Sequence, residues 1–263
     1  MTVGNLELSI LWPAFLAGLL VLTTHVPLGQ QVLNRGIVFI DLAIAQVAGL
    51  GVTAADAFGF EPEGWRVQVA AVGAALIGAL LLTWTEKKWP EVQEALIGVL
   101  FVVAACIELL ILANNPHGGE HLKDLLVGQI LWVSVKNLMP IAILYAIALF
   151  VWFTMRTRIG QAGFYVLFAI VVTQSVQLVG IYLVFASLIV PALAAKRFAE
   201  GYRLGIGYTV GLVGYVAGLI ASSLFDLPTG AVIVVSLLLT FIAAVVTSLI
   251  APAGARAAAP KIA

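Results

Sequence analysis

The chain has 263 residues, of which 62% are hydrophobic and only 10% are charged, and its formal net charge is zero. Soluble domains average about 45–50% apolar and about 25% charged residues, so the composition excludes a soluble protein. Zero net charge leaves no electrostatic case for nucleic-acid binding. The single cysteine, Cys106, excludes a disulfide within the chain. The sequence therefore predicts a protein that lies in a lipid bilayer.

Apolar runs recur along the whole chain. About 20 apolar residues cross the hydrocarbon core as a helix, and helices are expected because lipid offers no hydrogen-bond partner to the backbone. The predicted segments lie at about 9–28, 37–57, 67–86, 95–114, 138–154, 164–179, 181–195, 205–224 and 230–251. The fold class is therefore all-α, a polytopic membrane helical bundle of eight to nine transmembrane segments. Residues 1–252 are expected to form one transmembrane domain, followed by a flexible cytoplasmic tail at 253–263.

The apolar stretch at 164–195 decides the predicted topology. It is too short for two full spans of about 20 residues each, and Gly180 divides it. Cytoplasmic loops carry an excess of Lys and Arg. If the stretch crosses and returns, ten basic residues share one side and three share the other, whereas a single crossing removes this asymmetry. The ten are Arg35, Lys87, Lys88, Arg156, Arg158, Lys196, Arg197, Arg203, Arg256 and Lys261, and the three are Arg66, Lys123 and Lys136. We therefore expect two short or tilted helices that meet at Gly180, the N-terminus outside and the C-terminus in the cytoplasm.

Ionisable residues within the apolar segments are candidate functional residues, because charge is costly in lipid. They are His25, Asp41, Glu94 and Glu108. Asp41 and Glu94 each begin a segment, where the dipole of a helix N-terminus favours an acid without any further role. Glu108 lies within a turn or two of the expected outer end. Its position favours a functional role or a buried pair.

Three glutamines, Gln46, Gln174 and Gln177, also lie within apolar segments. The simplest interpretation of each is an interhelical hydrogen bond, worth about 0.6–2 kcal/mol. Gln174 and Gln177 are three residues apart, so a helix places both on one face. Two amides beside the Gly180 break also favour a polar lining of a path through the membrane.

One predicted outer loop, NNPHGGEHLKD, carries His117, Glu120 and His121. Their spacing matches the H-x-x-E-H signature of one class of metalloproteases. That signature needs a regular helix, and the neighbouring proline and glycines favour a turn instead. A loop that loosely collects divalent cations is the second interpretation, and an ordinary solvated loop is the third.

No G-x-x-x-x-G-K-[ST] loop occurs in the sequence. Such a loop cradles nucleotide phosphates with its backbone amides and its lysine. The chain therefore does not bind ATP by that route, and any coupling to ATP requires a partner protein.

Four stretches resemble the integral-membrane permease subunits of the bacterial ABC importers for zinc, manganese and iron. In chain order they are VPLGQQVLNRGIVFIDLAIAQ, EALIGVLFVVAACIELLIL, VQLVGIYLVFASLIVPALAAKRFA and SSLFDLPTGAVIVV. The third is similar to the family's V-Q-x-V-G-x-L-L-V-x-A-L-L-I-I-P-A-A-T-A-R, and the fourth to its S-Y-x-x-D-L-P-T-G-P-x-I-V-L. Together the four cover most of the chain.

The resemblance implies a homodimeric permease in the bacterial cytoplasmic (inner) membrane. Its partners would be two cytoplasmic ATP-binding subunits and an extracytoplasmic metal-binding protein that delivers the ion. No cofactor would be bound permanently; a divalent metal ion would be transported, and ATP would bind the partner subunit. The resemblance places a coupling helix, which docks into the ATPase, at Ala192 to Tyr202. The residues of the predicted contact are Ala195, Lys196, Arg197, Phe198, Ala199, Glu200, Gly201 and Tyr202.

The sequence departs from the family at one candidate ligand. The family's acid matches Asp41, but its histidine four residues later falls on Ala45, with Gln46 one position beyond. His25 or Glu108 are the candidates to replace that histidine. Zinc prefers Cys, His and carboxylate ligands. The oxygen-rich set of Asp41, Gln46 and Glu108 fits manganese or iron(II) at least as well.

The leading hypothesis is the permease of an ATP-driven divalent metal importer that works by alternating access. Asp41 would be a transient ion ligand, and Gln174 and Gln177 would line the path. A secondary transporter driven by an ion gradient is the alternative; broken helices at midplane are also expected there, although no convincing internal repeat is seen. An intramembrane metalloprotease built on His117, Glu120 and His121 is the third hypothesis.

Overall fold

A computed structural model describes residues 8–60, 64–112, 122, 125–128, 130–155 and 158–250 of the chain. Helices make up its regular structure, and no strand occurs in those ranges. The helices are α1 (Leu8–Arg35), α2 (Ile40–Ala57), α3 (Trp65–Lys88), α4 (Gln93–Leu112), α6 (Val135–Met155), α7 (Gly160–Val179), α8 (Ile181–Ala195), α9 (Arg203–Phe225) and α10 (Thr229–Ile250). Short 3-10 turns lie at Pro90–Val92, Ile130–Trp132 and Glu200–Tyr202. Eight helices of the described chain are long and apolar enough to span a membrane, and α8 is shorter. The predicted all-α membrane bundle is confirmed.

The first helix is longer than the sequence predicts. It was expected to end near residue 28, but α1 continues through Pro27 to Arg35. It ends where Gly36 adopts a positive φ of 72° and the Ile37 N–H bonds back to the Val32 carbonyl. This is how a glycine just past a helix end satisfies the last carbonyls. The boundary prediction was wrong because hydrophobicity ends before the backbone signal that stops the helix.

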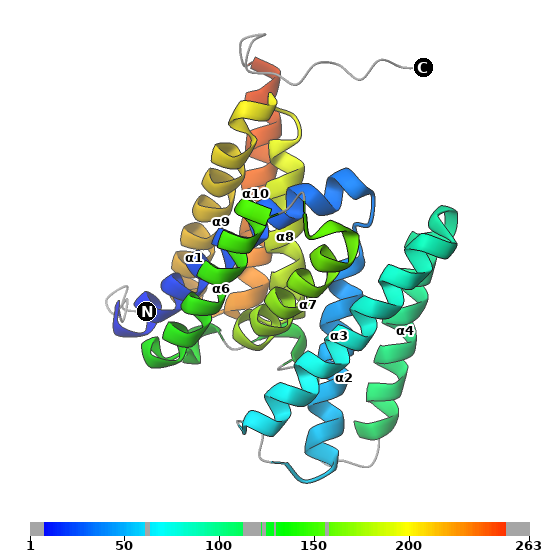
Figure 1. The fold of residues 1–263 in the computed structure, drawn as a ribbon. Coiled ribbons are helices and arrows are strands. Elements are labelled where there is room, and N and C mark those ends of the chain that lie inside the picture. Colours follow the sequence, from blue (N-terminus) through cyan, green and yellow to red (C-terminus); the bar gives the residue numbers. More distant parts are fainter. Residues whose placement is uncertain are drawn as a thin grey trace.

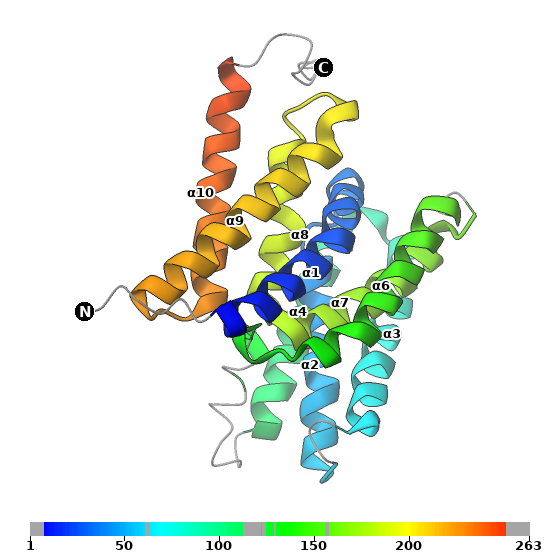
Figure 2. The same ribbon diagram turned by 90° about the vertical axis from the view of Figure 1, so that its left-hand side faces the viewer.

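The helices form two groups with α7 between them (Figure 1). In one group α1 and α10 pack against α8 and α9; in the other α2 packs against α3 and α4. A view from the side shows α9 and α10 leading away from the α2–α4 group (Figure 2). The α7 helix packs on α3 and α2. It also contacts α1 and α8, and so it connects the two groups.

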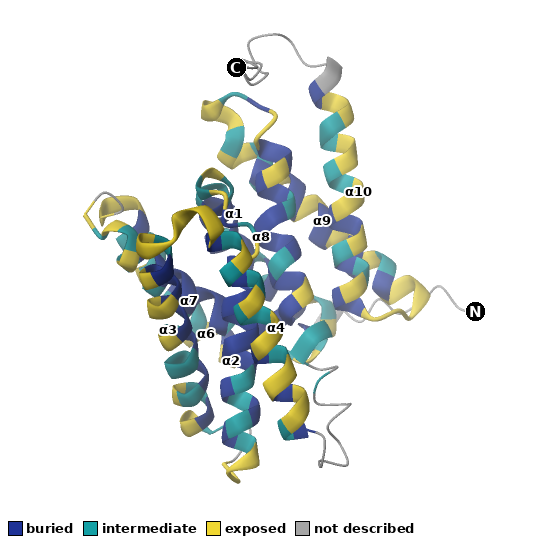
Figure 3. Ribbon diagram, turned by 90° about the vertical axis from the view of Figure 1, so that its right-hand side faces the viewer, coloured by how far each residue is buried: buried dark blue, intermediate teal, exposed yellow. Residues whose placement is uncertain are grey.

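Burial distinguishes central helices from peripheral ones. The α8 helix is largely buried, whereas α10 carries exposed residues along its length (Figure 3). Among the eight long spans α2 is the most enclosed, with 67% of its apolar window buried, against 22% for α4 and for α6. Apolar faces left exposed are expected of helices that contact lipid. The buried polar residues of α2 are therefore shielded from the bilayer.

The predicted break at Gly180 is confirmed. The α7 helix ends at Val179 and α8 begins at Ile181, and Gly180 has φ 81° and ψ 162°. A Cβ at Gly180 would lie 2.4 Å from the backbone N of Gly128, and a Cβ at Gly128 would lie 2.2 Å from the carbonyl C of Val179. Two glycines therefore let two backbones touch at the break.

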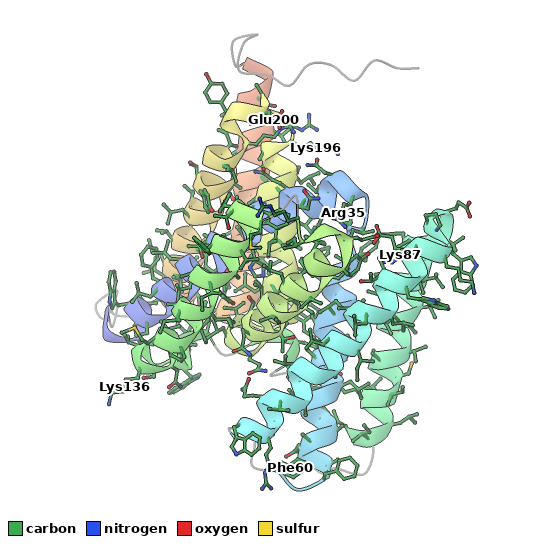
Figure 4. The ribbon with its side chains drawn as sticks, viewed as in Figure 1. Arg35, Phe60, Lys87, Lys136, Lys196 and Glu200 are labelled. Carbon is green, nitrogen blue, oxygen red and sulfur yellow. The ribbon has the colours of Figure 1, made fainter. Side chains whose placement is uncertain are left out.

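Three of the ten basic residues expected to share one side are labelled in Figure 4, and they lie toward one end of the bundle. Arg35, Lys87 and Lys196 are near the upper end in Figure 4, with Glu200, whereas Lys136 and Phe60 are at the opposite end. We call these the basic end and the opposite end. The assignment of the basic end to the cytoplasm stays a prediction.

Candidate functional site

Asp41 lies in the first turn of α2, and its side chain is only 1% exposed. Neither carboxylate oxygen has a hydrogen-bond partner of normal geometry within the described part of the chain. An ionised carboxylate without a partner is costly in a medium of low dielectric. A cation would supply the missing partner. Asp41 is therefore the clearest candidate ion ligand of the chain.

A second acid lies at the same end of α2. Oε1 of Glu94, in the first turn of α4, accepts the N–H of Phe39 at 3.2 Å, and Phe39 is the N-cap residue of α2. The carboxylate thus satisfies a backbone donor that the helix itself leaves unpaired. This contact supports the structural interpretation of Glu94, although it caps the neighbouring helix rather than its own.

Glu108 is buried between α4 and α2, with 1% of its side chain exposed. It accepts hydrogen bonds from Nε2 of Gln46 and, at 2.8 Å, from Oγ1 of Thr53. We call Gln46, Thr53 and Glu108 the Glu108 cluster. The predicted interhelical bond of Gln46 is confirmed, as is the buried pair of Glu108. Thr53 was missed by the sequence reading, although it follows Gln46 by seven residues and so shares its helix face.

The structure does not bring Asp41 into the Glu108 cluster. Gln46 follows Asp41 by five residues on the same helix, which turns it about 140° around the axis at 3.6 residues per turn. Thr53 lies about 18 Å further along α2 than Asp41, at 1.5 Å per residue. Of the three oxygen-bearing residues proposed together from the sequence, Gln46 on α2 therefore meets Glu108 on α4, whereas Asp41 in the first turn of α2 does not bond either of them.

Gln174 and Gln177 form a chain of amides with a third glutamine. Nε2 of Gln174 donates to Oε1 of Gln68 at 3.3 Å, and Nε2 of Gln68 donates to Oε1 of Gln177 at 2.6 Å. Gln68 lies in the first turn of α3, and the sequence reading missed it. The interhelical bonds expected of Gln174 and Gln177 are confirmed. Gln177 is also exposed, three residues before Gly180, so a role in lining a path stays a prediction.

His25 is fully buried within α1. Its Nδ1 lies 2.9 Å from the carbonyl O of Val21 and 3.1 Å from Oγ1 of Thr24. A carbonyl oxygen only accepts, so the first contact assigns a proton to Nδ1. The α1 helix packs mainly on α8 and α9, away from the cluster between α2 and α4. Nε2 of His25 has no hydrogen-bond partner among the described residues, but the packing of α1 does not place it in the Glu108 cluster, so a replacement of the family's ligand by His25 stays a prediction.

The connection from α8 to α9 differs from the predicted coupling helix. Ala192 to Ala195 belong to α8, a turn follows, and Glu200–Tyr202 form a short 3-10 helix. Phe198 is buried at 7% exposure, and its carbonyl accepts from Nε of Arg203 at 3.2 Å. The exposed residues of the connection are Lys196, Arg197, Glu200, Gly201 and Tyr202. A coupling helix was expected at Ala192 to Tyr202, but the structure has the end of α8, a turn and a 3-10 helix there before α9 begins. The basic exposed surface itself is present.

The predicted outer loop with His117, Glu120 and His121 lies outside the described residues. The structure therefore tests neither the cation-collecting role nor the protease interpretation of this loop. Among described residues, no group of three or more His, Cys, Asp or Glu side chains is placed to hold a metal ion. The candidate ion ligands among the described residues are therefore Asp41, which is within electrostatic reach of Glu94, and Glu108, which is hydrogen-bonded to Gln46 and Thr53.

Comparisons with known proteins give one family model, several membrane-protein relatives and one structure of the same fold. The model of the ABC 3 transport family matches residues 7–160 and 154–248. The high-affinity zinc uptake system membrane protein ZnuB of Haemophilus influenzae is 23% identical over 86% of this chain and 93% of its own length. A probable metal transport system membrane protein of Thermotoga maritima is 24% identical over 90% of this chain and 89% of its own. Among solved structures, PsaBC from Streptococcus pneumoniae in complex with Fab has the same fold, with a TM-score of 0.72 and 20% identity over 90% of this chain and 91% of that one.

Proposed function

The chain belongs to the ABC 3 transport family, and we propose that it is the membrane-spanning subunit of an ATP-driven importer of divalent metal ions. The resemblance read from its four sequence motifs is thereby confirmed at the level of the family. Relatives described as zinc, iron and metal transport membrane proteins support a metal ion as the cargo. The subunit would work as a homodimer with two cytoplasmic ATPases and an extracytoplasmic metal-binding protein.

The observation that carries this proposal is Asp41. Its carboxylate is buried in the most enclosed span, and its oxygens have no partner of normal geometry within the described residues. The backbone N–H groups of Asp41 and Leu42 lie near this carboxylate but make no hydrogen bond of normal geometry with it, and the N-cap amide of α2, that of Phe39, is bonded by Glu94. The Asp41 carboxylate can therefore bind a passing cation. A permease needs such a ligand, whereas an acid with only a structural role would not have to bind an ion.

Alternating access requires an element with two arrangements whose balance ATP binding shifts. The Gly180 break is the candidate, because a hinge is a short segment that absorbs a change in φ and ψ. At the far end of α8 from the break lie the exposed Lys196 and Arg197. A force applied by an ATPase at that connection would reach Gly180 through one short helix.

The test is metal uptake in a bacterial strain that lacks its own importers and expresses this chain with its ATPase and metal-binding protein. We expect uptake that needs all three, and a fall of at least about tenfold in Asp41→Asn, since losing even an outer-shell partner of a metal ligand costs 10–100-fold in affinity. The matched control is Asp56→Asn, an acid on the same helix that is only partly buried.

Two results would contradict the proposal. Uptake that persists without the ATPase and follows a proton gradient would identify a secondary transporter, the alternative that broken helices also allow. Unchanged uptake in Asp41→Asn, in protein of normal abundance, would remove Asp41 from the path.

A further inference from the structure

We propose that a pocket beside the α9–α10 turn receives a cationic side chain, an arginine or a lysine, of the extracytoplasmic metal-binding protein. This inference rests on the proposed function, which supplies that partner. The pocket has a volume of about 350 Å³ and is lined by residues 127, 128 and 130–132 and by residues 226–230. The charged residue among them is Asp226. We call this the Asp226 pocket.

The Asp226 pocket lies on the side of the membrane domain away from the predicted ATPase contact. The α9 helix has 23 residues, so at 1.5 Å per residue it carries the chain about 34 Å from the connection at Glu200–Tyr202 to Asp226. This length exceeds the hydrocarbon core of about 30 Å. Trp132, which lines the pocket, is also four residues from Lys136 at the opposite end (Figure 4). The charge count predicts that this end faces outward, where the metal-binding protein would deliver the ion.

The carboxylate of Asp226 stands where the local backbone disfavours it. Asp226 is the C-cap residue of α9, with φ 51° and ψ 50°, and it is the one non-glycine residue of positive φ within the described ranges. Glycine is the usual residue at such a position, and a negative charge beside a helix C-terminus is unfavourable. An aspartate can offset the strain by a local hydrogen bond, but its side chain makes none in the described part of the chain. Strained residues of this kind cluster at functional sites.

The chemistry of the pocket fits an organic cation. The Asp226 carboxylate has no ion pair with any described residue, and the Trp132 side chain is 81% exposed. A guanidinium or ammonium group forms charge-assisted hydrogen bonds with a carboxylate and is attracted to the face of an indole. A hard divalent ion instead needs several oxygen ligands, and no second acid lines the pocket among the described residues. Tryptophan and arginine are also the residues that most often dominate binding between proteins.

The Asp226 pocket is joined to the Gly180 break by direct backbone contacts. Gly128, in the wall of the pocket, lies against Gly180 on one side. On the other side, a Cβ at Gly230 would meet the carbonyl oxygen of Val127. A side chain that binds in the pocket therefore contacts the same segment that touches the break. Docking of the partner would in this way favour one of the two arrangements of α7 and α8.

The experiment measures binding of the purified, metal-loaded metal-binding protein to the whole importer in lipid nanodiscs, by biolayer interferometry. Asp226→Gly should weaken binding by at least about tenfold, because it removes one member of an interfacial charge pair. The same variant should unfold at an equal or higher temperature, because glycine accommodates a positive φ without strain. A residue with only a structural role would not give both results. The matched control is Asp56→Asn, an acid near the end of α2 and outside the pocket, which should change neither.

Substitutions in the partner identify the occupant. Each exposed arginine and lysine of the metal-binding protein is replaced by alanine in turn. One replacement should weaken binding to the wild type and have little further effect on Asp226→Gly, as expected of two groups in one contact. Trp132→Ala should weaken binding as well.

Two results would overturn the proposal. The first is equal affinity of the partner for the wild type, Asp226→Gly and Trp132→Ala. The second is stabilisation by phosphatidylethanolamine of the wild type but not of Asp226→Gly, which would assign the pocket to the ammonium group of a lipid.

Uptake by the whole importer separates this proposal from the proposed function. A large excess of the metal-binding protein should restore uptake by Asp226→Gly, because only docking is weakened, but should not restore uptake by Asp41→Asn. If uptake needs all three components while Asp226→Gly binds the partner normally, the pocket proposal is refuted and the importer stands. If the wild-type importer carries no divalent ion, the proposed function itself fails.

Discussion

Gly180→Ala tests the break between α7 and α8 most directly. The glycine has φ 81° and ψ 162°, a region that is essentially restricted to glycine and costs other residues about 1–3 kcal/mol. The new Cβ would also lie 2.4 Å from the Gly128 nitrogen and 2.6 Å from the Val127 carbonyl carbon. Overpacking of this kind costs about 1–3 kcal/mol more. We therefore expect the free energy of unfolding to fall by about 3 kcal/mol or more.

The assay is thermal unfolding of the purified protein in detergent, followed by tryptophan fluorescence. The matched control is Gly73→Ala, since Gly73 lies inside α3 and a Cβ there meets no atom within 4 Å. Alanine is the better helix former by about 1 kcal/mol, so the control should be unchanged or slightly stabilised. The double variant Gly128→Ala with Gly180→Ala should lose less than the sum of the two single losses, because both perturb one contact. An unfolding midpoint for Gly180→Ala equal to that of Gly73→Ala would refute the close backbone contact.

Two further predictions concern the amide chain and the basic end. Gln68→Leu removes both hydrogen bonds of the amide chain and should lower the free energy of unfolding by about 1 kcal/mol. Gln177→Leu should have similar stability but should reduce metal uptake more, because Gln177 is the exposed amide at the break. Equal uptake in the two variants would leave the amides a purely structural role. Arg197→Glu should weaken co-purification of the ATPase and lower metal-stimulated ATP hydrolysis. Lys136→Glu is the control at the opposite end and should change neither. An equal effect of both variants would place the ATPase contact elsewhere.

Sequence alone determined the features that depend on one segment at a time. Apolar runs predict helices because lipid leaves the backbone no other hydrogen-bond partners, and all nine predicted segments correspond to helices. Arg35, Lys87 and Lys196 lie toward one end and Lys136 toward the other, as the charge count predicted. Gln46, Asp41 and Glu108 were found as candidates because polar groups in apolar runs are conspicuous. Gly180 was found for the converse reason, since it interrupts a run too short for two spans.

Tertiary structure decided which of these residues meet. All the helices are apolar, so hydrophobicity does not show that α4 rather than another helix packs on α2. The contact between Gln46 and Glu108 could therefore not be predicted. The roles of Thr53 and Gln68 could not be predicted, because threonines within helices and glutamines near helix ends are common. Only the packed structure shows their hydrogen-bond partners. The separation of Asp41 from the Glu108 cluster likewise follows from helix geometry and packing. The sequence shows which residue types lie in each segment, but the contacts between distant segments depend on how the helices pack.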